Sequence, residues 1–272
     1  MESALGRFYH GFKRAERSRC NICGQRRMLT WDHVPPRRCQ DRTAVELQTA
    51  FQNLVSGKKN YSYSISQNGV KYRTLCRECN NDLLGARLDP HLVRFSDEIA
   101  SAITSRLTMP RFYPVPVDVP KLVRAVYGHM LAAKVTREDT VSDQLMRATV
   151  LEPAAPLPPQ LRLFFWVYPY SGVVAIRDVI MPTRRGDSES LSMFSILKFF
   201  PVAFLLADCK VYEGLPHLDA QSHGPAASNI NVDLKLVKPP DWPEEVERGN
   251  FVLAGQSWGS AVTARPRKQG GR

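Results

Sequence analysis

Four cysteines, arranged in two Cys-x-x-Cys pairs, are the residues whose spacing most clearly indicates chemistry. The pairs are Cys20–Cys23 and Cys76–Cys79. This spacing lets both thiolates of one turn reach the same ion, and Zn²⁺ takes four such ligands in tetrahedral geometry. The N-terminal residues contain no apolar stretch typical of a secretory signal, so a metal is favoured over disulfides. The sequence therefore predicts one structural zinc ion, held by all four thiolates with no open position for a substrate.

A second candidate site is the dipeptide Asp32-His33, which lies between the two cysteine pairs. It ends a strand expected over Met28–His33 and directly precedes Val34 and two prolines. A histidine beside a carboxylate can act as a general base, and a carboxylate can bind a hard cation such as Mg²⁺. A lone Asp-His pair more often has only a structural role. The catalytic interpretation is favoured here because the pair lies between the two cysteine pairs that are predicted to bind zinc.

Together these segments resemble the HNH endonucleases of the ββα-metal superfamily. The resemblance covers about residues 18–90 and rests on three segments: Cys20-x-x-Cys23, Trp31-Asp32-His33-Val34-Pro35-Pro36 and Leu75-Cys76-x-x-Cys79-Asn80-Asn81. More narrowly, they are similar to bacterial members with an Asp-His-Val-Pro-Pro strand and a Cys-x-x-Cys-Asn helix start. The resemblance implies a Mg²⁺- or Mn²⁺-dependent enzyme that hydrolyses DNA, with a role in phage defence or restriction.

The resemblance also implies a role for each matching residue. Asp32 would bind the catalytic cation and His33 would take a proton from the attacking water. Asn80 stands at the position of the family's last histidine and would bind the cation through its amide oxygen. The cation would stabilise charge on the leaving 3′ oxygen, so the products would carry 5′-phosphate and 3′-hydroxyl ends. The middle asparagine of the motif stays open between Asn68, Asn60 and Asn53, and further candidates near the helix are Asn81, Asp82, Asp89 and His91.

The charge of the chain supports a polyanionic partner. The net charge is +11 and the pI is near 9.5, and residues 1–90 carry 16 basic but only 8 acidic side chains. Such a balance favours nucleic acid, and we expect double-stranded DNA. The candidate phosphate-binding residues are Arg26, Arg27, Arg37, Arg38, Lys58 and Lys59. The alternative is a non-catalytic zinc-ribbon protein that binds nucleic acid or another partner.

Periodicity and turn signals predict an α+β fold. Helices are expected at Thr43–Val55, Asn80–Leu88, Ser96–Leu107 and Pro120–Val135. Two hairpins are expected, one joining Tyr61–Ser66 to Val70–Leu75 around Asn68-Gly69, the other joining Leu161–Tyr168 to Val173–Met181. Further strands are expected in Phe194–Asp208 and Ile230–Val237.

The same signals predict two domains. A zinc-containing HNH-like nuclease domain would span residues 1–108, and a proline-rich linker would follow at 109–119. An α+β domain with an antiparallel sheet would span residues 120–272, with a disordered basic tail at about 263–272. This second domain would regulate the nuclease, bind a partner protein or form a homodimer. No apolar run reaches membrane-spanning length, so a cytoplasmic protein is expected.

Overall fold

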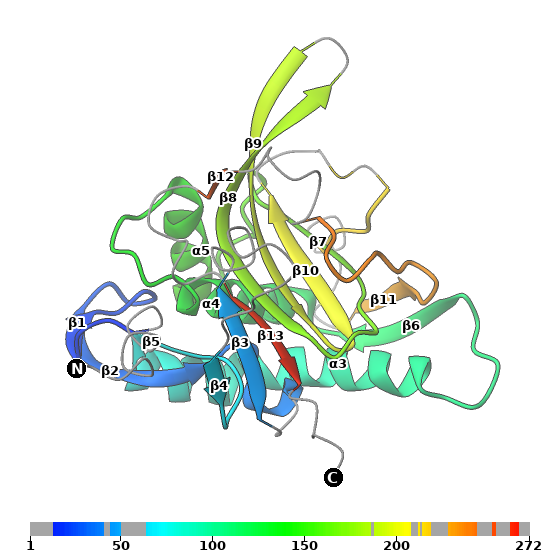
Figure 1. Cartoon of the computed structure of the whole chain (residues 1–272), viewed down its shortest axis with the longest axis horizontal. Coiled ribbons are helices and arrows are strands. Elements are labelled where there is room, and N and C mark those ends of the chain that lie inside the picture. Colours follow the sequence, from blue (N-terminus) through cyan, green and yellow to red (C-terminus); the bar gives the residue numbers. More distant parts are fainter. Residues whose placement is uncertain are drawn as a thin grey trace.

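Antiparallel sheets and helices together form the protein, which confirms the predicted α+β class. The computed structural model describes residues 13–40, 44–49, 64–185, 188–207, 212, 214–218, 228–243, 252–253 and 262–266. A three-stranded sheet has the order β1-β2-β5, and a larger sheet has the order β4-β3-β13-β8-β9-β10-β7, with β12 paired to β8. A third, two-stranded sheet pairs β6 with β11 (Figure 1).

The strands and helices have the following bounds. The strands are β1 Arg17–Arg19, β2 Arg26–His33, β3 Val45–Thr49, β4 Ser64–Ser66, β5 Lys71–Cys76, β6 Phe112–Val117, β7 Arg162–Val167, β8 Val173–Arg185, β9 Ser188–Phe199, β10 Val202–Ala207, β11 Ser228–Asp233, β12 Val252–Leu253 and β13 Val262–Pro266. The helices are the 3₁₀ turn η1 Arg37–Cys39, the π-helical η3 Glu78–Leu88, and the α-helices α3 Asp89–Ile103, α4 Val119–Ala132 and α5 Val141–Leu151. None of the described helices is long and apolar enough to cross a bilayer.

The larger sheet is buried on both faces at β7 and β10, which explains why β10 is apolar at every position and β7 at every position after Arg162. One face of β7, with Leu163 and Phe165, packs in the same core as α3 and α4. The opposite face, with Phe164 and Trp166, packs against a second cluster that includes Trp242. A strand covered on both sides needs apolar residues at consecutive positions rather than at alternate ones. All six residues of β10 are accordingly buried.

Helix α4 lies at the centre of the molecule and contacts elements from both halves of the chain. Asp118 caps its first turn by accepting a hydrogen bond from the Lys121 N–H at 3.1 Å. Gly128 allows η3 to approach α4 closely, because a Cβ at this position would lie 2.3 Å from Leu84 Cδ2. Helix α4 therefore forms one packed layer with η3, α3 and α5 (Figure 1).

A buried network of four charged side chains joins α4, α5 and β8. Lys134, just after α4, pairs with Asp143 of α5 and with Asp178 of β8. Arg177 of β8 pairs with the same two carboxylates and donates to the Met130 carbonyl. Because two cations face two carboxylates, the network is neutral as a whole, and every charge has a partner despite its burial.

Several elements differ from the sequence prediction because strands pair with distant partners. The helix predicted over Thr43–Val55 is wrong at 45–49, where the chain forms β3 and pairs with β13. The prediction of a disordered tail is wrong at 263–266, which belong to β13. Pairing with a strand from the far end of the sequence overrides local helix propensity.

Both predicted hairpins are also wrong. Strand β4 pairs with β3, and β5 pairs with β2, although Gly69 between β4 and β5 does have the positive φ expected of the turn. Strand β7 pairs with β10, while β8 pairs with β9. A turn signal places two strands near each other in sequence, but the partner is decided by which edge buries the most apolar surface.

The predicted linker and one helix start need correction as well. Residues 112–117 form β6, which pairs with β11 along six residues, so this part of the linker is an ordered strand. Helix α3 begins at Asp89 instead of Ser96, whose hydroxyl donates to the Leu92 carbonyl inside the helix. The strand at Met28–His33 and the helix at Pro120–Val135 are confirmed as β2 and α4.

Candidate functional site

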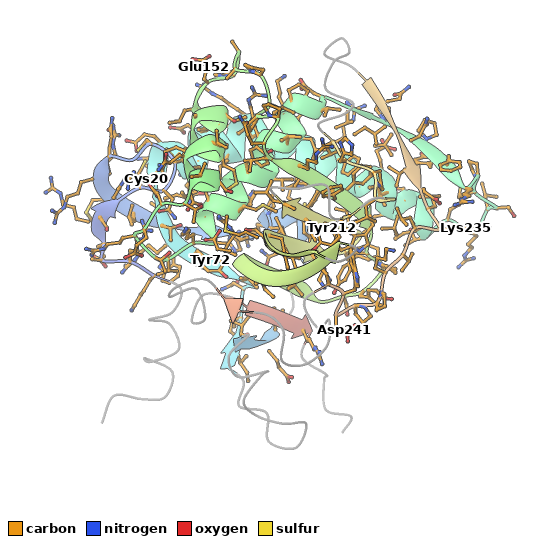
Figure 2. The ribbon with its side chains drawn as sticks, turned by 90° about the horizontal axis from the view of Figure 1, so that it is seen from above. Cys20, Tyr72, Glu152, Tyr212, Lys235 and Asp241 are labelled. Carbon is orange, nitrogen blue, oxygen red and sulfur yellow. The ribbon has the colours of Figure 1, made fainter. Side chains whose placement is uncertain are left out.

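The four cysteines of the two pairs come together at one point. The sulfur atoms of Cys20, Cys23, Cys76 and Cys79 all lie within 4.8 Å of one another, and all four are free thiols. The Cys23 and Cys76 sulfurs are 3.8 Å apart, about the separation that tetrahedral bonds of about 2.3 Å to one ion require. Cys20 is labelled in Figure 2, at the end of the molecule formed by β1 and β2. The cluster could thus hold one Zn²⁺ ion with its coordination complete.

Hydrogen bonds to the Cys20 sulfur favour the thiolate form that binds metal. Gly24, with φ +71°, closes the first turn by donating its N–H to the Cys20 carbonyl at 3.0 Å. The Cys76 N–H donates to the Cys20 sulfur at 3.3 Å. The pKa of Cys20 is lowered to about 5, chiefly by a hydrogen bond from the Cys79 thiol and also by backbone N–H groups of the two turns.

The cysteine cluster is anchored on the carboxyl end of α4. The Asn21 amide donates to the Leu131 and Lys134 carbonyls at 2.7 and 2.6 Å. The Thr74 hydroxyl of β5 donates to the Ala132 carbonyl at 2.7 Å. The last carbonyls of an α-helix have no hydrogen-bond donors within the helix. Here the side chains of Asn21 and Thr74 act as their donors.

Asp32 and His33 occupy the end of β2 and point in different directions. Asp32 is 6% exposed and faces the core, where burial raises the pKa of its carboxyl to about 7, although nearby His129 opposes this shift. The His33 side chain is half-buried, and burial together with Lys71 and Arg37 lowers its pKa to about 4. His33 is therefore neutral at pH 7, with a nitrogen lone pair that can accept a proton.

Asn80 connects the start of η3 to the strand that carries Asp32 and His33. Its amide nitrogen donates to Thr30 Oγ1 at 2.9 Å and to the Trp31 carbonyl at 3.0 Å. Both acceptors directly precede Asp32 in β2. Asn80 thus fixes the distance between the helix and the strand end.

Replacing Asn80 with alanine should lower stability by about 1–2 kcal/mol, because two hydrogen bonds between η3 and β2 are lost. Thermal unfolding of the zinc-loaded protein measures this change. Asn81→Ala is the matched control, because Asn81 is the adjacent, exposed residue of the same helix. Equal melting temperatures for the two variants would show that Asn80 has no such positioning role.

His129 is a site residue that the sequence analysis missed. It lies on α4, is fully buried, and its Nε2 is 2.9 Å from Asp89 Oδ1. Its Nδ1 is 3.7 Å from Asp32 Oδ2. Burial lowers the pKa of His129, but Asp89 and Asp32 outweigh burial and raise it overall. A single histidine in an apolar helix is most simply interpreted as a core residue, so only the fold reveals its two carboxylate neighbours.

Basic side chains, three of them exposed and two half-buried, form a row along the small sheet that ends at His33. Two of them have acidic partners: Arg19 pairs with Asp139 at 2.9 Å and Arg73 with Glu16 at 3.1 Å. The register places Arg17 opposite Met28, Arg19 opposite Arg26, Arg73 opposite Trp31 and Lys71 opposite His33. We call the five cationic residues of this row the basic strip: Arg17, Arg19, Arg26, Arg73 and Lys71. Trp31 is 41% exposed, and the Arg73 guanidinium lies 5.6 Å from the centre of its ring. Cationic and aromatic groups in one row are typical of surfaces that bind nucleic acid.

A cleft of about 590 Å³ lies beside the site. Its charged lining consists of three arginines, Arg37, Arg38 and Arg94, and three carboxylates, Asp89, Asp97 and Glu98. Because Arg37 also lowers the pKa of His33, this cleft and the half-buried face of His33 share one electrostatic environment.

No family model, curated protein or solved structure matches this chain.

The remaining predicted site residues are dispersed. Arg27 pairs with Glu78 at 2.7 Å, so its charge is partly neutralised. Asn68 lies in the turn before β5, and its backbone is hydrogen-bonded to His33. Asn81 and Asp82 are exposed on η3, and His91 is half-buried on α3. Four predicted residues lie outside the described part of the chain: Asn53, Asn60, Lys58 and Lys59.

Proposed function

We propose that this protein is a metal-dependent endonuclease of the HNH type, which hydrolyses phosphodiester bonds in DNA. One observation carries the proposal: Asp32 and His33 end a strand that is paired with β5 and tied by Asn80 to the helix directly after β5. The four-cysteine cluster lies at the other end of the β2–β5 pair, where Cys76 ends β5 and pairs with Leu29 of β2. A strand pair, a helix and a four-cysteine cluster around an Asp-His dipeptide are the parts that a ββα-metal domain requires, and their proximity supports this proposal.

In this proposal His33 acts as the general base. Its lowered pKa keeps it neutral, and its hydrogen bond to the Asn68 backbone orients the ring. The neutral imidazole takes a proton from a water molecule, which attacks the phosphorus in line with the leaving 3′ oxygen. A divalent cation held at Asp32 would supply stabilisation of the negative charge that develops on the phosphate. The zinc-binding cysteines have only a structural role, because four protein ligands leave no site for a substrate.

DNA is the proposed substrate because two cationic residues lie near His33: Lys71 is opposite it in the sheet register, and Arg37 is close enough to lower its pKa. The basic strip continues along the small sheet, and Arg37, Arg38 and Arg94 line the cleft. Contacts to phosphates fix the position of a backbone without reading its sequence. We therefore propose binding with little sequence preference at this surface.

Incubation with supercoiled plasmid tests this function. Nicked or linear products should form with Mn²⁺ or Mg²⁺ and should be absent when a chelator removes the divalent cation. DNA binding without cleavage under any of these cations would contradict an endonuclease and favour the zinc-ribbon binding protein.

Replacing Arg37 and Arg38 together with alanine should weaken DNA binding by about tenfold at 0.1 M salt, a rough estimate for the loss of two phosphate contacts. The logarithmic salt slope should become shallower by about two, because fewer counterions are released. Fluorescence anisotropy with several unrelated duplexes measures both quantities.

The matched control is Arg106→Ala with Arg111→Ala, which removes the same charge after α3 and next to β6, at the end of the molecule away from β1 and β2 (Figure 1). An equal loss of affinity in the two double variants would show that only net charge matters. A loss confined to some sequences would show that Arg37 or Arg38 reads bases.

A further inference from the structure

Two buried polar atoms without hydrogen-bond partners face each other between β2 and α4. Asp32 Oδ2 and His129 Nδ1 are both inaccessible to solvent, and neither has a hydrogen-bond partner. They are 3.7 Å apart, which is too long for a direct hydrogen bond. Buried polar atoms without partners are rare in proteins and call for an explanation such as a bound ion.

The contact between His129 Nε2 and Asp89 leaves Nδ1 as the ring nitrogen that could bind a ligand on the Asp32 side. Nε2 lies 2.9 Å from Asp89 Oδ1, a distance at which the ring N–H donates to the carboxylate. When a cation displaces the proton from Nδ1, the neutral ring keeps its proton on Nε2 and directs a lone pair toward Asp32. A metal-binding histidine almost always donates its other N–H to a carboxylate, a backbone carbonyl or a water molecule.

The gap between these two polar atoms has the right width for a cation. Bonds from a divalent first-row metal to a carboxylate oxygen or an imidazole nitrogen are about 2.1 Å long, so two of them span up to about 4.2 Å. Positive charge between Asp32 and His129 would also satisfy both atoms at once.

We propose that Asp32 Oδ2 and His129 Nδ1 together bind one divalent cation of the first transition row, such as Mn²⁺, with Asp89 as the positioning residue. This inference deepens the proposed function, because it assigns the catalytic cation to a histidine of α4 instead of to Asn80. An imidazole ligand favours Mn²⁺ and later metals over Mg²⁺ and Ca²⁺, which prefer oxygen. The cation site is thus completed by a residue far outside the segment that carries the HNH-like motifs.

Titration of the zinc-loaded full-length protein with Mn²⁺, followed by electron paramagnetic resonance, tests the proposal. We expect about one bound Mn²⁺ per chain, with Mg²⁺ or Ca²⁺ competing only at concentrations at least about tenfold higher. His129→Gln should weaken Mn²⁺ binding at least about 10- to 100-fold, and Asp89→Asn should weaken it to a smaller extent within that range. The matched control His217→Gln should bind Mn²⁺ as the unaltered protein does, because His217 packs against Phe164 of the larger sheet.

Because His129 is fully buried, a second measurement uses the unaltered protein. Pulsed resonance of bound Mn²⁺ should show coupling to a ¹⁴N nucleus that disappears when histidine is labelled with ¹⁵N. The coupling should persist in His33→Asn. Unchanged Mn²⁺ affinity in folded His129→Gln, or a Mn²⁺ signal without histidine nitrogen coupling, would overturn the assignment.

These measurements separate the site from the proposed function. Binding of Mn²⁺ through His129 in a protein that leaves plasmid DNA intact would support the site and contradict the nuclease. Metal-dependent cleavage by a protein whose Mn²⁺ shows no histidine coupling would support the nuclease and contradict the site.

Discussion

Cys76→Ser is expected to abolish zinc binding and to unfold the segment that contains β1, β2 and β5. Cys76 belongs both to β5 and to the four-cysteine cluster, and its N–H donates to the Cys20 sulfur. Structural zinc contributes about 10–16 kcal/mol to folding of small zinc domains, whereas whole domains are stable by only about 5–15 kcal/mol. Loss of one of four ligands should therefore remove most of the stability of this segment.

Elemental analysis and thermal unfolding measure this effect, with one zinc per chain expected in the unaltered protein. Cys39→Ser is the matched control, because Cys39 lies in η1 outside the cluster, with its sulfur 3.9 Å from the Ser96 hydroxyl. It should retain zinc. Zinc-free protein that is fully folded, or a Cys76→Ser variant with full zinc content, would refute the metal assignment.

His33→Ala is expected to lower the rate of plasmid cleavage by about 10²- to 10⁴-fold, the usual contribution of a general base. Its side chain is half-buried at a strand end, so the variant should keep its fold and its zinc. DNA affinity should be nearly unchanged, because His33 is neutral at pH 7. Single-turnover cleavage, measured beside DNA binding, distinguishes loss of catalysis from loss of substrate.

His91→Ala is the control for this experiment. His91 is another half-buried histidine whose pKa is lowered by burial, and it lies on α3. Its removal should leave the cleavage rate within about twofold, as for a surface position away from the chemistry. Cleavage by His33→Ala at the unaltered rate would show that another group activates the water.

The parts of the site that the sequence predicted are those encoded by local spacing. A Cys-x-x-Cys turn brings two sulfur atoms together in any fold. Because one zinc ion takes four ligands, the two cysteine pairs are expected to meet. Strand β2 was predicted correctly at Met28–His33, where the prolines stop it, although a register shift between Thr30 and Trp31 breaks the alternation of its faces.

The parts that the sequence did not predict depend on contacts between distant residues. Strand β3 has the composition of a helix but pairs with β13, near the other end of the chain. His129 is surrounded by apolar residues in its own helix, and its two carboxylate partners come from β2 and α3. No local pattern encodes such partners, because they are set by how the layers pack.

Because the cysteine cluster is anchored on α4, the N-terminal segment depends on α4 for its folding. Asn21 and Thr74 donate to carbonyls at the end of α4, and Leu84 of η3 packs against Gly128 within it. A fragment cut before α4 would keep all four cysteines and both residues of the Asp32-His33 pair. It would lose the acceptors for these side chains and the apolar surface that covers Leu84. The segment with the cysteine pairs and the Asp32-His33 dipeptide is therefore not expected to fold independently. Grafting it into another protein would require α4 to be included.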